Sequence, residues 1–351
     1  MITMLPLISV CIPAYNRANV LPQLLESIVT QHAVAFEVVI CEDMSPQRES
    51  IREIVAGFSE QYPGLIHYFE NEENLGYDAN LRRLIEKASG DYCLFMGNDD
   101  LMCAGALETV SSALQRYPGT GAVLRSYALI DDDSNQSSQV FRYFPEERFF
   151  PAGAPTLITF FKRMVVLPGI VLHRESCQKY ATSRFDGTLL YQLYLVGRIL
   201  AEKNGVFLPQ VIVLYRTGGV PDFGVSSAEQ GKFVPTQQTP ASSLHFMQGM
   251  LEIARALERD TGLSLYESIQ RDLSNYSYPF IAIQRKQSLK VFVRYCLNLA
   301  RLGFGRYPMF YVYVVSLLIL GERLSSEIMG LIKRLVGHTP VLGRVYQGQN
   351  P

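Results

Sequence analysis

The chain has 351 residues, 48% of them hydrophobic, which is enough for one large domain with an appendage or for two domains. A formal net charge of −1 excludes an overall basic excess, and no segment offers about 18 or more uninterrupted apolar residues, so no membrane-spanning helix is expected. The six cysteines include no Cys-x-x-Cys pair, and residues 1–9 lack the basic start of a signal peptide. We therefore expect a cytoplasmic protein with reduced core thiols.

Short apolar segments alternate with amphipathic ones through the first 130 residues. The apolar segments predict strands at 7–12, 36–41, 65–70, 92–96 and 122–130. The amphipathic segments predict helices at 19–30, 49–61, 78–88 and 105–116. Strands that alternate with helices at this spacing predict an α/β fold, a Rossmann-like and mostly parallel sheet with helices on both faces.

The pattern is less regular beyond Asp131. The sequence predicts a polar loop, a helix, a strand, a second helix and a final strand pair, at 131–138, 156–166, 170–173, 186–202 and 206–215. Residues 217–241 are rich in Gly, Pro, Ser and Gln, which is typical of a flexible loop or a lid.

Only helices are predicted after this loop. Their expected ranges are 242–259, 264–275, 289–302, 308–322 and 324–336. The predicted organisation is a catalytic domain of residues 1–216, a loop of residues 217–241 and a helical C-terminal region of residues 242–351.

Polar side chains follow three of the predicted strands. They are the segment 13–17 after the first strand, Glu42 and Asp43 after the second, and the segment 98–100 (Asn-Asp-Asp) after the fourth. Ligands of open parallel sheets bind outside the carboxyl ends of the strands. Several acids and an arginine that can converge there predict a site for a nucleotide with a hard divalent cation, Mg²⁺ or Mn²⁺. Taken alone, two adjacent aspartates after a strand more often cap a helix.

These motifs, in this order, resemble those of the family 2 glycosyltransferases, which have the GT-A fold. Pro-x-Tyr-Asn of that family is matched at 13–16, Asp-Asp-Gly-Ser at 42–45 (Glu-Asp-Met-Ser), and Asn-x-Gly at 74–76. Ala-x-Gly-Asp-Tyr is matched at 88–92, and it leads to Gly-Asn-Asp-Asp at 97–100, where the family has Asp-x-Asp-Asp. The resemblance covers residues 6 to about 216. Gly97 makes this strand end similar to those of O-antigen abequosyltransferases and rhamnosyltransferases.

The resemblance implies which residues bind a nucleotide-sugar donor. These are Pro13, Ala14, Tyr15, Arg17, Glu42, Asp43, Gly76, Asn80, Asn98, Asp99 and Arg216. It implies that Asp99, with Asp100, holds Mn²⁺ or Mg²⁺ beside the diphosphate. For Asn80 a place on a solvated helix face, and for Arg216 a surface ion pair, are the structural alternatives.

The expected general base of the family is absent. The family has Glu-Asp six residues before an arginine that Arg198 matches, whereas this chain has Tyr191 and Gln192 there, and an amide cannot accept the proton. Asp186 and, in the predicted loop, Asp222 are the candidate bases. The structural alternative for Asp186 is a helix N-cap.

The C-terminal region combines positive charge with apolar side chains. Residues 285–351 contain ten Lys or Arg and two Asp or Glu, against 22 basic and 31 acidic residues before them. Residues 307–320 are apolar around most of a helix circumference. This mixture favours peripheral docking at the cytoplasmic face of the inner membrane over binding to nucleic acid. A homodimer formed through these helices is the competing hypothesis.

The resemblance implies a metal-assisted glycosyltransferase. It would move a sugar from a nucleotide diphosphate to a glycan or a polyprenyl-linked glycan in bacterial surface polysaccharide synthesis, with inversion. Two alternatives stay open: a polyprenyl-phosphate sugar synthase, and an inactive nucleotide-binding scaffold at the membrane.

Overall fold

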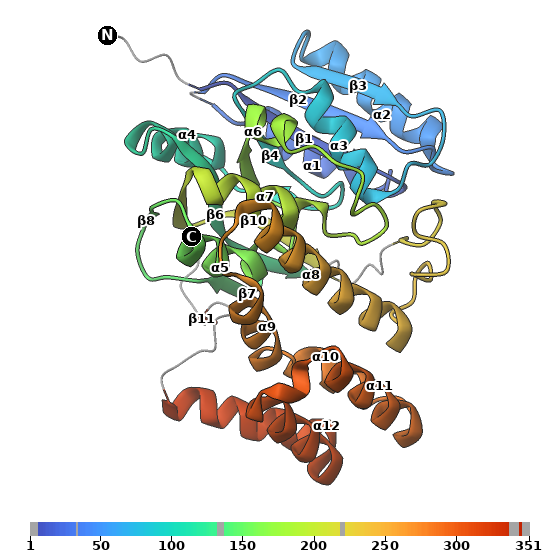
Figure 1. Cartoon of the computed structure of the whole chain (residues 1–351). Coiled ribbons are helices and arrows are strands. Elements are labelled where there is room, and N and C mark those ends of the chain that lie inside the picture. Colours follow the sequence, from blue (N-terminus) through green and yellow to red (C-terminus); the bar gives the residue numbers. More distant parts are fainter. Residues whose placement is uncertain (1–5, 33, 132–136, 218–221, 337–343, 346–351) are drawn as a thin grey trace.

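The computed structural model describes residues 6–32, 34–131, 137–217, 222–336 and 344–345 (Figure 1). Its N-terminal half contains four parallel strands in the spatial order β3-β2-β1-β4. They are β1 (Ile8–Ala14), β2 (Phe36–Glu42), β3 (Ile66–Glu70) and β4 (Tyr92–Phe95). The connecting helices are α1 (Leu21–Val29), α2 (Arg48–Gln61) and α3 (Tyr77–Lys87). Because these strands are parallel, their polar carboxyl ends lie at one edge of the sheet.

The central strands are buried on both faces, which explains their continuous apolar runs. Side chains alternate between two hydrophobic clusters along β1: Val10 and Ile12 belong to one, and Cys11 belongs to the other. On β2, Val38 and Val39 divide in the same way. This alternation confirms an α/β sheet that is covered by helices on both faces.

The sheet continues from β4 as a mixed sheet. β9 (Ile170–His173) pairs antiparallel with β4 and with β6 (Thr120–Asp131), and β6 pairs parallel with β10 (Asn204–Thr217). Short antiparallel strands complete this half: β5 (Leu101–Met102), β7 (Ser137–Arg142), β8 (Arg148–Phe150) and β11 (Arg344–Val345). The strand pair predicted at 206–215 was wrong, since β10 is a single long strand with irregularities in its register.

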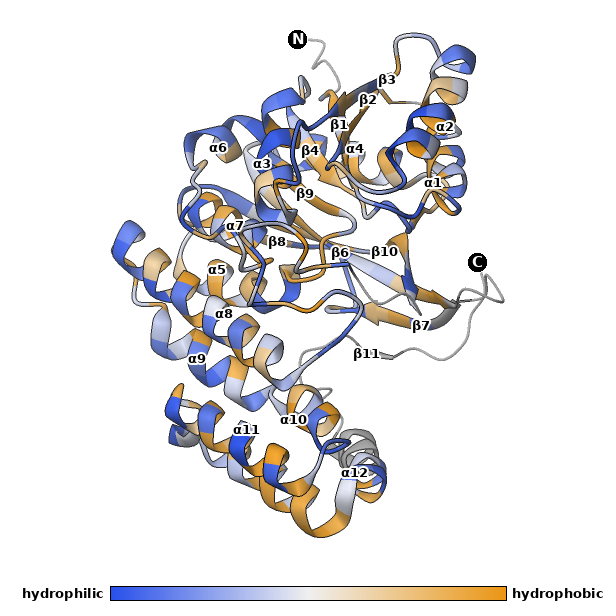
Figure 2. Cartoon of the chain, turned by 90° about the vertical axis from the view of Figure 1, so that its right-hand side faces the viewer, coloured by the Kyte–Doolittle hydropathy of each residue, from blue (hydrophilic) through white to orange (hydrophobic). Residues whose placement is uncertain are grey.

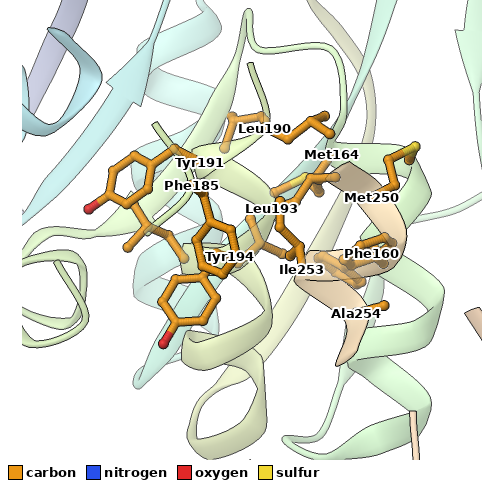
Figure 3. Packing of buried hydrophobic residues seen from close by; sticks show 14 of the residues in the cluster. Phe160, Met164, Phe185, Leu190, Tyr191, Leu193, Tyr194, Met250, Ile253 and Ala254 are labelled. Atoms are coloured by element: carbon orange, nitrogen blue, oxygen red, sulfur yellow. The ribbon is translucent and has the colours of Figure 1, made fainter. Parts of the chain in front are cut away.

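Helices of the second half pack against the sheet and against one another. They include α4 (Ala106–Arg116), α5 (Ala154–Phe161), α6 (Arg174–Lys179), α7 (Tyr191–Glu202), α8 (Pro240–Thr261) and α9 (Tyr266–Asn275). Figure 3 shows Leu193 and Tyr194 of α7 among Phe160, Ile253 and Ala254 of α5 and α8. One hydrophobic cluster therefore continues from the sheet into the C-terminal helices.

The last helices form a lobe at the end of the molecule that is remote from the parallel strands (Figures 1 and 2). They are α10 (Tyr278–Gln284), α11 (Leu289–Arg301) and α12 (Pro308–Val336). The sequence did not predict α10, and it divided α12 into two helices. That division is confirmed near Gly321, whose φ of 72° and ψ of −178° are not helical, so α12 consists of two helical segments joined at a kink.

Candidate active site

The loop after β1 is a tight turn that reaches the end of β4. Asn16 and Arg17 have positive φ angles of 54° and 65°, a conformation that is uncommon for residues other than glycine. The side-chain amide of Asn98 donates to the carbonyl oxygens of Tyr15 and Asn16, at 3.2 and 3.1 Å. These bonds hold the turn in place, and the Arg17 guanidinium lies 2.7 Å from the Asp99 carboxylate.

The two adjacent aspartates after β4 have different environments. The Asp99 side chain is 25% exposed and pairs with Arg17. Asp100 is 1% exposed, and its Oδ1 accepts a 2.9 Å hydrogen bond from the backbone N–H of Arg216. Burial, together with the neighbouring Asp99 charge, raises the pKa of Asp100 to about 8. Only Asp99 is therefore placed to meet a ligand from solvent.

Arg216 stabilises this corner from the end of β10. Its Nε donates to the backbone carbonyl of Asp99 at 2.7 Å, and a terminal nitrogen donates to Gln23 on α1 at 2.8 Å. The side chain is buried. Arg216 thus positions the backbone of Asp99. The sequence did not predict this role.

Gly97 and Asp100 depend on each other. A Cβ atom at Gly97 would lie 2.3 Å from Oδ2 of Asp100. The Asp100 carboxylate therefore occupies the space that the side chain of a family Asp-x-Asp motif would enter. The inward position of the Asp100 side chain therefore requires glycine at position 97, where the family has aspartate.

We expect Gly97→Ala to destabilise the protein by about 1–3 kcal/mol, because the new methyl group must displace a buried and hydrogen-bonded carboxylate. A thermal melt would measure this change. Gly57→Ala is the matched control: it lies within α2, nothing stands within 4 Å of the added Cβ, and its melting midpoint should stay level or rise. Equal midpoints for Gly97→Ala and the wild type would refute the coupling.

Asp43, at the end of β2, organises a second part of the site. Its carboxylate accepts hydrogen bonds from Asn71 and from the backbone N–H groups of Leu75 and Gly76, at 2.8–2.9 Å. Gly76, with φ of 82°, begins the turn into α3. Burial nevertheless raises the pKa of Asp43 above its ordinary value. Asp43 therefore fixes the loop that the Asn-x-Gly motif marked in the sequence.

Two further predicted donor residues have mainly internal partners. Glu42 is fully buried, and it accepts from the backbone N–H groups of Met44 and Ser45 and from Arg48. Asn80 is also buried, and its side chain donates to the carbonyl of Cys41 at 3.0 Å. Both side chains support the strand-end loops. Pro13 and Ala14 complete β1, and the Ala14 carbonyl accepts from the Asp43 N–H at 3.0 Å.

The described part of the predicted loop, from Asp222 onward, packs on the same edge of the sheet. Asp222 accepts a 3.0 Å bond from the side-chain amide of Asn16. Glu229 accepts from the N–H of Tyr77 at the start of α3 and from the N–H of Gly224, both at 2.8 Å. Burial raises the pKa of Tyr15, and the charge of Asp222 raises it further, so this tyrosine also lies near the loop.

Glu229 was not predicted as a site residue. Its carboxylate meets the positive end of the α3 dipole, an arrangement that stabilises the helix start. No spacing motif relates residue 229 to residue 77, so only the tertiary structure reveals this contact.

The two candidate bases differ in their surroundings. Both oxygens of Asp186 accept hydrogen bonds from Arg82 at 2.8 Å. Asp222 instead accepts its hydrogen bond from Asn16, in the loop after β1. Asp186 is not the N-cap of α7, which is Leu190. Gln192, at the family's position for the base, is 1% exposed and donates to the carbonyl of Val165 at 2.9 Å.

Asp78 replaces Asp186 as the acid that caps α7. Its two oxygens accept from the backbone N–H groups of Thr188, Leu189 and Tyr191, at 2.9–3.0 Å. Asp78 lies on α3 and is 1% exposed. Since helix N-termini leave N–H groups without partners, this carboxylate links α3 to the start of α7.

The donor set fits a cation that is shared with a substrate. Among the described residues, no group of three or more His, Cys, Asp and Glu side chains could enclose a metal ion. Asp99 offers one accessible carboxylate. Mg²⁺ and similar ions are commonly held by one or two carboxylates together with substrate phosphates and water, so Asp99 suits this mode.

Comparison with known proteins shows a family resemblance over part of the chain. Residues 9–178 match the model for glycosyl transferase family 2. Abequosyltransferase RfbV of Salmonella typhimurium is 34% identical over 108 residues, which are 31% of this chain and 32% of that protein. The GalNAc(5)-diNAcBac-PP-undecaprenol beta-1,3-glucosyltransferase of Campylobacter jejuni is 24% identical over 135 residues, 38% of this chain and 42% of that protein. The chain thus spans less than half the length of either relative.

Solved structures with low sequence identity share the fold over nearly the whole chain. TarS 1-349 of S. aureus, in complex with UDP-GlcNAc, aligns with a TM-score of 0.59 at 14% identity, covering 98% of this chain and 99% of that one. The mannosyltransferase PcManGT of Pyrobaculum calidifontis, in complex with GDP-Man and Mn²⁺, aligns with a TM-score of 0.51 at 16% identity, covering 97% and 83%. The motifs, the topology and these matches agree: residues 9–178 are similar to glycosyl transferase family 2, and the chain has the GT-A fold.

Proposed function

We propose that this protein transfers one sugar from a nucleotide-diphosphate donor to a glycan or a polyprenyl-linked glycan, in the synthesis of a bacterial surface polysaccharide. The observation that carries the proposal is the cluster of Arg17, Asn98 and Asp99, which joins the first loop to the end of β4. The name of one relative supports the acceptor class, since that protein acts on an undecaprenol-linked glycan, and the name of another, an abequosyltransferase, supports sugar transfer.

The donor would bind along the edge formed by the β1 loop, Asp43 and Asp99. Tyr15 offers a ring and a hydroxyl group, and Arg17 offers a guanidinium suited to phosphate oxygens. The Asp43 carboxylate would fix the loop before α3 and so shape the nucleotide pocket. The Arg17 guanidinium, which pairs with Asp99 in the absence of ligand, would move to the diphosphate when the donor binds.

Asp99 would hold Mn²⁺ or Mg²⁺, and the bound cation would neutralise charge on the departing nucleoside diphosphate. Related structures support this choice of metal, since PcManGT was crystallised with GDP-Man and Mn²⁺. Asp100 is buried and accepts a hydrogen bond from the Arg216 N–H, so it would stabilise the loop after β4.

The acceptor hydroxyl would attack the anomeric carbon, and the bond from this carbon to the diphosphate oxygen would break with inversion. Asp222 would take the hydroxyl proton, since it is hydrogen-bonded to Asn16 in the loop after β1, whereas Asp186 is paired with Arg82. The nucleoside diphosphate would leave with the electron pair of the broken bond.

The matched variants Asp222→Asn and Asp186→Asn test this assignment. Asp222→Asn keeps an oxygen for the Asn16 bond but loses basicity, so we expect kcat to fall about 100-fold with little change in the donor KM. Asp186→Asn should keep kcat within about threefold, since its role is structural. Steady-state kinetics would measure both. Full turnover by Asp222→Asn would exclude Asp222 as the base.

Binding of the donor can be tested without knowing the sugar. Thermal melts with UDP, GDP, CDP and dTDP, each with and without Mn²⁺, report binding to the folded state by mass action. We expect one nucleotide to raise the midpoint in a metal-dependent way. Absence of any shift would favour the inactive scaffold.

Gln192 favours one second candidate, a polyprenyl-phosphate sugar synthase. A phosphate nucleophile needs little help from a base, so an amide at this position would not impede the reaction. Incubation with donor and bare polyprenyl phosphate distinguishes the two: a lipid-phosphate sugar product would support the second candidate.

We place the protein at the cytoplasmic face of the inner membrane, where lipid-linked acceptors would be available. The basic and apolar C-terminal region supports this location. A homodimer through the same region is the competing arrangement.

A further inference from the structure

The first half of α12 exposes a continuous apolar stripe to solvent. Tyr311, Val312, Val315 and Ile319 are 53%, 50%, 50% and 75% exposed. Residues four positions apart lie on one side of a helix, so the series 311, 315 and 319 forms a single line. We call these four residues the outer stripe of α12.

The opposite side of the same helix is packed into the protein. Phe310, Tyr313 and Leu317 are buried. The Tyr313 hydroxyl donates to the carbonyl of Asn275 at 2.8 Å, and its ring meets Tyr278 edge to face at 5.5 Å. The outer stripe is therefore not the core side of an amphipathic helix, because α12 already has a core side.

A second exposed stripe lies on α11. Leu289, Val293 and Leu297, again four residues apart, are 55%, 38% and 55% exposed. Lys290 and Arg294 form a parallel line beside them, one position further along. Figure 2 shows hydrophobic colour along both α11 and α12 at the end of the molecule that carries the lobe. The lobe thus presents apolar and basic side chains together.

The lobe carries a net positive charge. Residues 285–328 contain seven Lys or Arg and two acids, Glu322 and Glu327. Glu322 lies 3.6 Å from Lys286, and Glu327 lies 3.5 Å from Arg323. The acids are thus matched within the lobe, and Lys290 and Arg294 add an excess of positive charge beside the apolar stripes.

We propose that the outer stripe of α12 and the exposed stripe of α11 dock this protein on a bilayer that contains anionic phospholipid, with α12 lying in the plane of the interface. The apolar stripes would enter the boundary between head groups and acyl chains, and Lys290 and Arg294 would meet lipid phosphates. The proposal goes beyond sugar transfer and can be tested without turnover.

Two other uses of the stripes fit the structure less well. Among the described residues, one helical segment, Pro308–Ile328, is long and apolar enough to cross a membrane. Spanning would require Phe310, Tyr313 and Leu317 to leave their packing. A two-fold interface between copies would bring the same basic line from each copy together, which costs electrostatic energy.

Flotation of the full-length protein with vesicles tests the proposal. The vesicles are phosphatidylcholine alone, or phosphatidylcholine with about 30% phosphatidylglycerol. The variants are Val315→Glu and Ile319→Glu in the outer stripe, and Lys290→Gln with Arg294→Gln beside it. Gln115→Glu, at an exposed position of α4, adds the same charge away from the lobe and is the matched control. Thermal melts verify that each variant is folded.

We expect the wild type and Gln115→Glu to float with the anionic vesicles, and each outer-stripe variant to lose at least about tenfold in partitioning. The Lys290 and Arg294 variant should lose binding mainly to anionic vesicles and become less sensitive to salt. Equal flotation of all variants, or none by the wild type, would overturn the proposal. So would a wild-type dimer in sedimentation that Ile319→Glu dissociates, because a second copy would then cover the stripe.

Discussion

Asp99→Asn is expected to reduce sugar transfer by at least about 100-fold, because it removes the one accessible carboxylate at the end of β4. The amide keeps the size of the side chain and can still accept a hydrogen bond from Arg17. The backbone position should also persist, since Arg216 holds the Asp99 carbonyl. The loss should therefore appear in kcat and in metal dependence rather than in folding.

The measurement combines initial rates with thermal melts in the presence of nucleoside diphosphate. In Asp99→Asn, Mn²⁺ should no longer increase the stabilisation that the nucleotide provides, while the midpoint without ligand stays within a few degrees of the wild type. Glu108→Gln, an exposed acid on α4, is the control and should behave as wild type. If Mn²⁺ still increased the stabilisation by nucleotide in Asp99→Asn, the cation would bind at another residue.

Asp78→Ala is expected to destabilise the protein by about 3 kcal/mol or more at pH 5, because three buried N–H groups lose their acceptor. The effect should lower the melting midpoint by roughly 5 °C. Glu108→Ala, which removes an exposed acid from the first turn of α4, should change stability by less than about 0.5 kcal/mol. Equal midpoints for Asp78→Ala and the wild type would contradict the role of this cap.

The pH dependence gives a second readout of Asp78. Burial raises its pKa to about 7, against an ordinary value of 3.8, although hydrogen bonds from Tyr191 and Leu189 oppose the change. Between these values the folded protein holds a proton that the unfolded chain has released. The stability from this group is therefore complete at low pH and is lost as the pH rises through about 7. The difference between wild type and Asp78→Ala should narrow from pH 5 to pH 8 in thermal melts.

The sequence predicted the parallel half of the sheet because its signals are local. Apolar runs mark β1, β2 and β4, and each is followed by polar residues that suit a strand end. The added antiparallel strands are short or irregular, as β5 and β8 show, so their pairing depends on distant partners rather than on a repeating pattern. For the same reason the start of α7 was misplaced, since its cap comes from Asp78 on α3.

What the sequence by itself determined is the resemblance to the family 2 glycosyltransferases, the order of the motifs and the placement of Asp43 and Asp99 at strand ends. These depend on residue types at short spacings, which a linear reading detects. Only the tertiary structure decided that Asp99 faces Arg17 while Asp100 turns inward, that Arg82 holds Asp186, and that Glu229 reaches α3. Burial and long-range hydrogen bonds determine these differences, and neither can be predicted from the neighbouring residues in the chain.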